Sequence, residues 1–279
     1  MYTTDLSRMC EVSAMEFSDC KQMTAWLRTR ESNVSVLIAA RATLRVLPML
    51  AADLHHVDGA SFFRSQIVLP VFRALAAAWT IVNYPEIIDH ASAPGAADAA
   101  GAAEDAANAA VASNVATAAR STAEAAVASD AATAARFGAE TADVATAAGE
   151  APDATAGAVA AASAIYDGEI GRAFWEAISA DAARIADGES VFDVAQSPLW
   201  PDGQPLGGIW RNLRDNLLTA NEDWQVWTGW YENRLIGGAR RWDHELVYAR
   251  IPEKLWNRGP STVNGWIRSQ IPSPRSGLP

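Results

Sequence analysis

The sequence is poor in the residues from which catalytic and metal sites are most often built. Its 279 residues include two cysteines, Cys10 and Cys20, and four histidines. Two cysteines are too few for a disulfide framework or a zinc knuckle, so we expect reduced thiols in a cytoplasmic protein. The sequence has no nucleophile elbow, zinc-protease, P-loop or dinucleotide-binding motif. We therefore predict no catalytic residues and no cofactor.

Positive charge is also scarce. Lys21 and Lys254 are the only lysines, and 22 basic residues face 33 acidic ones, which gives a net charge of −11. A general nucleic-acid partner needs a basic surface, so the charge argues against one. Abundant arginine, alanine and tryptophan with little lysine is typical of a GC-rich bacterial genome.

Residues 95–164 lack leucine, isoleucine and tryptophan altogether. Alanine fills 35 of these 70 positions, and Phe137 is the only aromatic residue. Because alanine is the best intrinsic helix former, this Ala-rich tract is expected to be helical. A methyl group buries little apolar area, so the tract needs flanking segments to stabilise it. The alternative is a low-complexity, partly disordered segment.

The tract contains a tandem repeat with an offset of 16 residues. Residues 109–120 read AAVASNVATAAR, and residues 125–136 read AAVASDAATAAR. Ser121 and Glu124 resemble a capping box, which predicts a new helix after the first copy, and Gly138 predicts a stop after the second. We therefore favour short helices packed side by side. One long helix, with alanine on opposite faces, is the alternative.

The flanking segments carry helical periodicity, and no stretch shows the sustained alternation of a strand. The predicted fold is an all-α multi-helix bundle with the Ala-rich tract at its centre. We divide the chain into a helical segment at 1–94, the tract at 95–164, a Trp-rich helical module at 165–271 and a flexible tail at 272–279.

Residues 67–82 form the best membrane-spanning candidate. This stretch is 16 residues long and contains Pro70 and Arg73. A spanning helix needs about 20 mostly apolar residues, so we expect a buried helix and regard a membrane partner as unlikely. The N-terminus has no apolar core of a signal peptide, which agrees with a cytoplasmic location.

Tryptophan gathers in the last eighty residues, which hold eight of the eleven. Residues 223–235 read DWQVWTGWYENRL, in which Trp224, Trp227 and Tyr231 recur on one helical face and Trp230 widens it. Trp, Tyr and Arg are common in interface hot spots, so this face together with Arg234 is a candidate interaction surface. A tryptophan stripe is more often core, and we favour that interpretation.

The same stretch, with IPEKLWNRGP at residues 251–260 and Val263-Asn264, resembles a known module. Similar modules recur in uncharacterised alphaproteobacterial proteins that are often Ala-rich upstream and are sometimes joined to effector domains. The resemblance covers roughly residues 196–271. It implies an adaptor or sensor role and names no activity.

Two polar clusters could carry chemistry. His55, His56 and Asp58 offer imidazole and carboxylate ligands for a metal such as Zn²⁺, although a hydrophilic loop explains them more simply. Asp243-His244-Glu245 could supply a general base, but neighbours in a helix do not face one another. A solvated helix start is the simpler explanation of this second cluster.

Three functions follow in order of preference. The first is a non-enzymatic helical protein that works through contacts with a protein partner or with itself, as an adaptor, scaffold or regulatory subunit. The second is a metal-dependent enzyme that uses His55, His56 and Asp58. The third is a membrane-active helical protein in which residues 67–82 and the Ala-rich helices insert after a trigger.

Overall fold

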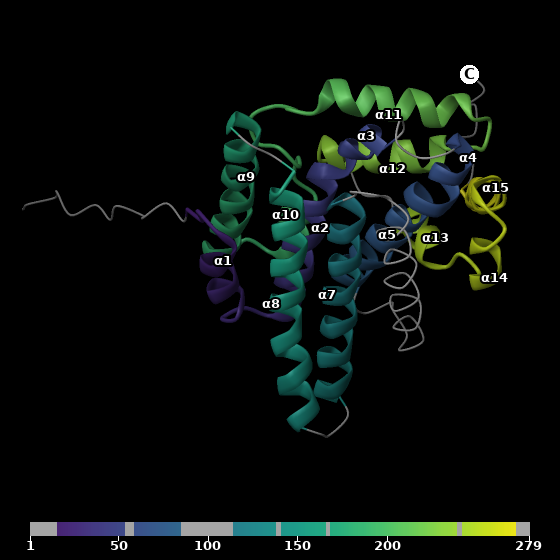
Figure 1. Cartoon of the computed structure of the whole chain (residues 1–279). Helices are drawn as coiled ribbons and strands as arrows, with labels where there is room; N and C mark the ends of the chain where they lie inside the picture. Colours follow the sequence, from purple (N-terminus) through teal and green to yellow (C-terminus); the bar gives the residue numbers. More distant parts are fainter. Residues whose placement is uncertain are drawn as a thin grey trace, which may run out of the picture.

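A computed structural model of the chain describes residues 16–53, 59–84, 114–137, 141–165, 168–238 and 242–271. All the regular structure in these ranges is helical, which confirms the all-α prediction. Figure 1 shows the helices packed into one body, with α7 and α8 crossing it as an antiparallel pair. The predicted tail at 272–279 lies outside the described residues.

The described helices occur in the following order along the chain. Those of the first segment and the tract are α1 (Cys20–Leu27), α2 (Ser32–Val46), η1 (Leu47–Met49), α3 (Leu50–Asp53), α4 (Ala60–Phe63), the π-helical turn η2 (Arg64–Val68), α5 (Leu69–Asn83), α7 (Asn114–Phe137) and α8 (Thr141–Ser163). Those of the Trp-rich module are α9 (Gly168–Ala186), α10 (Val191–Ala195), α11 (Gly207–Thr219), α12 (Gln225–Leu235), α13 (Trp242–Ala249), α14 (Glu253–Trp256) and α15 (Pro260–Gln270).

Helix α2 is the centre of the body. Every residue of this helix except Asn33 is buried. It contacts α5, α7, α8, α9 and α10, so elements from all three parts of the chain cover it. Its polar residues Arg41, Thr43 and Arg45 are enclosed together with its apolar ones, so the helix is buried on all sides. Helix α2 ends at the short 3-10 turn η1, which contains Pro48.

The described part of the Ala-rich tract, from residue 114 onward, folds as two long helices in place of several short ones. The break predicted at Ser121 is wrong: α7 runs through it for 24 residues, and the Ser121 side chain is buried. A capping serine is favoured where backbone N–H groups lack partners, and inside a continuous helix they have them. Helix α7 ends at Phe137, next to the predicted stop; Gly138 itself lies outside the described residues.

Small side chains let the two tract helices approach each other and α2 closely. A Cβ atom at Gly157 of α8 would lie 3.2 Å from the Ser121 hydroxyl of α7. Thr122 and Thr43 place their hydroxyls 2.8 Å apart across α7 and α2. Thr155 of α8 donates to the carbonyl of Ser35 at 3.0 Å. The tract is therefore clamped by neighbours at this end, as its low apolar content requires.

Candidate functional site

The aromatic face of α12 is part of the core. Trp224, Trp227, Trp230, Tyr231 and Arg234 are all buried, so the candidate interaction surface is not accessible in this fold. The core interpretation holds because the α12 face packs on bulky groups of α5. Phe72 stacks on Trp227 with ring centroids 5.1 Å apart.

Each of three buried or nearly buried indoles in this module finds an acceptor for its N–H group, as burial requires. Trp210 donates to Glu232 at 3.1 Å, and Trp224 donates to Glu222 at 2.8 Å. Trp227 donates to Asn264 at 2.7 Å. The acceptors come from α12, from the preceding turn and from α15, so the bonds fix these elements relative to one another.

Arg234 joins α12 to α5 and α13. Its guanidinium group lies 3.6 Å from the ring centre of Trp230 and 4.7 Å from that of Trp79. One nitrogen donates to the Trp230 carbonyl at 2.6 Å, and another lies 3.3 Å from the Glu245 carboxylate. A cation between two indole faces and a carboxylate is stabilised by its surroundings, which explains how a charged side chain is buried here.

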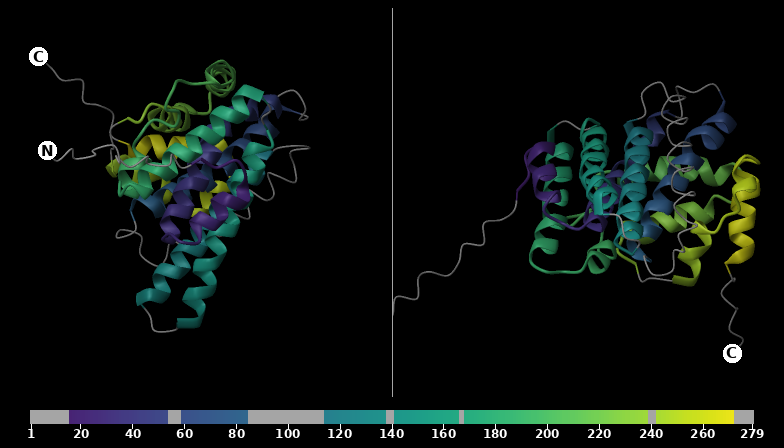
Figure 2. Two further views of the ribbon diagram at one scale, coloured as in Figure 1. Left: turned by 90° about the vertical axis from the view of Figure 1, so that its left-hand side faces the viewer. Right: turned by 90° about the horizontal axis from the view of Figure 1, so that it is seen from below.

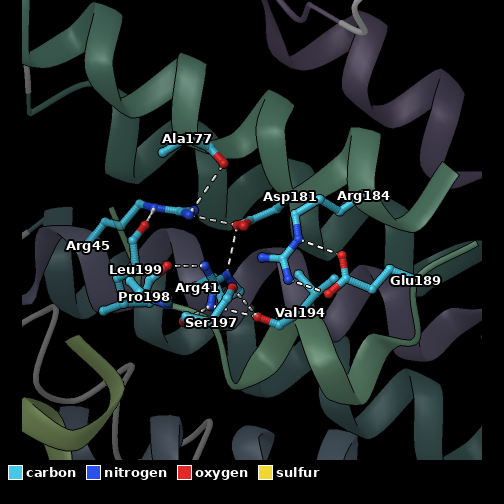
Figure 3. A network of polar contacts seen from close by, with 10 residues as sticks. All are labelled: Arg41, Arg45, Ala177, Asp181, Arg184, Glu189, Val194, Ser197, Pro198 and Leu199. Atoms are coloured by element: carbon cyan, nitrogen blue, oxygen red, sulfur yellow. Dashed lines mark hydrogen bonds and ion pairs between the residues drawn. The ribbon is translucent and has the colours of Figure 1, made fainter. Parts of the chain in front are cut away.

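The most connected polar site of the molecule lies at α2, where Arg41 and Arg45 share one carboxylate (Figure 3). The Asp181 oxygen Oδ2 of α9 accepts from Arg41 at 2.8 Å and from Arg45 at 2.7 Å. All three side chains are at most 4% exposed. This site brings together residues 136 to 140 positions apart in the sequence.

Both terminal nitrogens of Arg41 and the Nε of Arg45 hold the segment that follows α10. Arg41 donates to the carbonyls of Val194, Ser197 and Pro198 at 2.8–3.0 Å. Arg45 donates to the Leu199 carbonyl at 2.7 Å. Carbonyls at a helix C-terminus carry partial negative charge and lack partners within the helix. The two arginines therefore supply the hydrogen bonds that water would otherwise donate at this end of α10 and in the segment after it.

The electrostatics of this site favour the fully ionised state. Burial alone would raise the pKa of Asp181, but the charges and hydrogen bonds of Arg41 and Arg45 outweigh it and leave that pKa below its ordinary value. Burial lowers the pKa of Arg45 to about 10, still far above neutral. The site therefore keeps its charges at physiological pH. Because it is closed to solvent, we assign it a structural role.

Sequence reasoning missed this site. It did not identify Arg41 and Arg45 as buried residues, whereas both are enclosed. The signal was on the partner helix: Phe174, Ala177 and Ile178 form its apolar stripe, and Asp181 continues the stripe at the same spacing. A carboxylate on a buried stripe requires a buried cation.

A second feature of the structure is an arm formed by the far ends of α7 and α8. Helix α7 is about 36 Å long at ~1.5 Å per residue, and it packs along α8 as an antiparallel pair. We call residues 129–137 of α7 and 141–149 of α8 the distal arm. In Figures 1 and 2 the end of the α7–α8 hairpin next to its connection extends beyond every other described helix.

The two polar clusters from the sequence are placed differently. His55, His56 and Asp58 lie outside the described residues, and within the described ranges no group of three or more His, Cys, Asp or Glu could hold a metal. Helix α13 begins at Trp242, but its Glu245 is largely buried against Arg234, which corrects the solvated helix start predicted there.

Within the described residues, two helical stretches are long and apolar enough to cross a membrane, Ser32–Ala52 and Ala60–Asn83. Their apolar windows are 94% and 78% buried inside the protein. The predicted buried helix at 67–82 is thus found inside the second stretch, as η2 and α5. The core helices of soluble proteins have the same composition, so length and hydropathy alone do not identify a membrane segment.

The comparisons with known proteins found no match for this chain: no protein-family model, no curated protein and no solved structure matches it.

Proposed function

We propose that this chain is a non-enzymatic helical interaction protein, an adaptor, scaffold or regulatory subunit, which binds a protein partner through the distal arm. The observation that carries the proposal is the projection of the α7–α8 hairpin beyond the rest of the body. A helix pair satisfies its own backbone hydrogen bonds, so it can project into solvent and still offer its faces to a partner helix.

The composition of the distal arm suits close helix packing. Four of the nine residues in each half are alanine, and Phe137 and Val144 are the largest apolar side chains. Small residues let a third helix approach to the short end of the usual ~8–10 Å range. A partner that brings bulky apolar side chains would supply the buried area that alanine lacks.

The rest of the fold supports this role as a rigid base. The inner half of α7 is held by α2, α5 and α8, so the direction of the arm is fixed relative to the body. The Asp181 site and the indole hydrogen bonds fix the Trp-rich module in turn. An arm of fixed direction loses little freedom on binding, which favours affinity.

A deletion tests the proposal. Residues 129–149 are replaced by a short Gly-Ser turn, which removes the arm and leaves the described buried positions of α7 and α8 in place. A photo-crosslinking residue at Ala132 is compared with one at the exposed Asp202. We expect only the crosslinker at Ala132 to label a partner protein or a second copy of the chain. An excess of intact protein without the crosslinker should reduce this labelling by competition, whereas the armless protein should not.

The proposal fails if the armless protein competes equally well, or if Ala132 and Asp202 label the same proteins. Light scattering after size exclusion distinguishes self-association from a separate partner.

The metal-dependent alternative is tested by metal analysis of the purified protein and of the His56→Ala variant. A stoichiometric metal lost in that variant would favour it over an interaction protein.

Membrane activity is a second candidate, because Ser32–Ala52 and Ala60–Asn83 follow each other in the sequence and pack together. Insertion would have to remove Arg41, Arg45 and Arg73 from their carboxylate partners. A buried charge that loses its partner is destabilised by roughly 3–5 kcal/mol, which opposes insertion. Dye release from anionic vesicles tests this candidate, and an intact protein that releases none at neutral or acidic pH rules it out.

A further inference from the structure

A pocket lies where the π-helical turn η2 and the start of α5 face the turn between α14 and α15. Its volume is about 450 Å³, within the range of about 300–1,000 Å³ usual for small-molecule sites. Ser65, Gln66 and Arg73 line one side, and Trp256, Asn257 and Arg258 line the other. The pocket thus joins two parts of the chain that are about 190 residues apart.

The wall on the α5 side has an unusual backbone. Residues 64–68 form a π-helical turn directly before Pro70, and the Leu69 N–H donates to the Arg64 carbonyl. Proline has no N–H to continue an α-helical ladder, which accounts for the altered hydrogen bonding here. π-helical turns are rare and often occur at functional sites.

The opposite wall is positioned by Arg73. Its guanidinium lies 2.6 Å from the Glu253 carboxylate of α14 and 4.8 Å from the ring centre of Trp256. These contacts hold the α14–α15 turn against α5. They also offset the charge of Arg73, because Glu253 is its ion-pair partner.

Arg258 carries the remaining charge of the lining. It is exposed, and no acidic side chain of the described ranges forms an ion pair with it. The nearby carboxamides of Asn257 and Gln66 add uncharged donors. Gln66 uses one of its N–H groups on the Ser65 hydroxyl at 3.3 Å, and that hydroxyl donates to the Ser61 carbonyl at 2.9 Å. The second N–H of Gln66 is a further donor at the pocket.

We propose that this pocket binds a small organic oxyanion, a carboxylate or a phosphate ester. Arg258 would supply the charge-assisted hydrogen bonds, and Asn257 and Gln66 would add neutral ones. Trp256 and Leu69 would cover the apolar part of the ligand. Arg73 is a positioning residue, which keeps Trp256 in place through its contacts with the ring and with Glu253.

Calorimetric titration of the full chain tests the proposal at constant ionic strength, with succinate and inorganic phosphate as probes and sodium chloride as the blank. We expect saturable binding of at least one probe. Tighter binding of succinate assigns a carboxylate ligand, and tighter binding of phosphate assigns a phosphate ester. Arg258→Gln should weaken binding about tenfold or more, because it removes a charged donor.

Arg250→Gln is the matched control, since Arg250 is equally exposed and lies outside the pocket. It should bind the probe as the unmodified chain does, and thermal unfolding should show that both variants fold. The proposal is overturned if neither probe binds more tightly than roughly 10 mM. It is also overturned if Arg250→Gln weakens binding as much as Arg258→Gln, which would indicate a general charge effect.

Discussion

The indole N–H of Trp227 donates to the side-chain oxygen of Asn264 at 2.7 Å, across 37 residues of chain. The Asn264 amide then donates to the Glu222 carbonyl at 2.8 Å. Asn264 is fully buried, and its bond with Trp227 is buried, whereas its bond to the Glu222 carbonyl is partly buried. The two stretches that define the Trp-rich module are therefore joined by one carboxamide.

Asn264→Leu is expected to lower the free energy of unfolding by about 1–3 kcal/mol, because it leaves the buried Trp227 N–H without a partner and removes the donor to the partly buried Glu222 carbonyl. Urea unfolding followed by circular dichroism measures the change. In a double-mutant cycle with Trp227→Phe, the coupling should reach about 1 kcal/mol or more. The exposed Asn212→Leu is the control, with an expected change within about 0.5 kcal/mol. Simple additivity of the two core substitutions would contradict the link.

Asp181→Asn is expected to destabilise the protein by about 3–5 kcal/mol, because Arg41 and Arg45 would keep their charges without a buried counter-ion. Asp153→Asn is the matched control. Asp153 also pairs with an arginine, Arg28, at 2.7 Å, but both side chains are 60% exposed. An exposed pair contributes about 0–1 kcal/mol, so this variant should unfold at nearly the same urea concentration as the unmodified protein. Equal losses in the two variants would show that burial does not decide the outcome.

The pH dependence of stability should follow Asp181. Its folded pKa is lowered from the ordinary value of 3.8, so its contribution is fully present above about pH 4 and is lost as the pH falls below that value. The difference in unfolding free energy between the unmodified protein and Asp181→Asn should therefore shrink on acidification. Glu222, whose pKa is also lowered, is present in both proteins and cancels. A difference that is constant from pH 7 to pH 3 would be inconsistent with the shared ion pair.

Gly157 and Gly229 should respond in opposite ways to alanine, although both lie inside helices. A Cβ at Gly229 meets nothing within 4 Å, so Gly229→Ala should stabilise by about 0.5–1 kcal/mol through helix propensity. A Cβ at Gly157 would lie 3.2 Å from the Ser121 hydroxyl, so Gly157→Ala should be neutral or destabilising. The gain should return in a Ser121→Ala background, where the next atom is at an ordinary 3.6 Å. Thermal unfolding of the four variants checks the pattern.

Features that depend on neighbouring residues were predictable from the sequence. Helix α15 begins at Pro260, and α12 ends at Leu235, two residues before Gly237, whose φ of +66° suits glycine. The helical state of the described residues of the tract followed from alanine itself. That prediction succeeded because helix propensity acts within a few residues of chain.

Features that depend on distant contacts were not predictable in the same way. The capping signal at Ser121 is local, and the packing of α7 between α2, α5 and α8 overrides it. The oxyanion pocket joins residues 65–73 to 256–259, and no periodicity relates those two segments. The buried Asp181 site could be predicted only in part, from the position of this acidic residue on the apolar stripe of α9.

The position of α2 at the centre of the body has a consequence for biosynthesis. Asp181 is made 136 residues after Arg45, which at roughly 5–20 residues per second is a delay of about 7–27 s. During that interval Arg41 and Arg45 have no counter-ion, although α5, α7 and α8, which cover much of the helix, are made before Asp181. The ion pairs at the centre of the body can therefore form only after α9 has been synthesised.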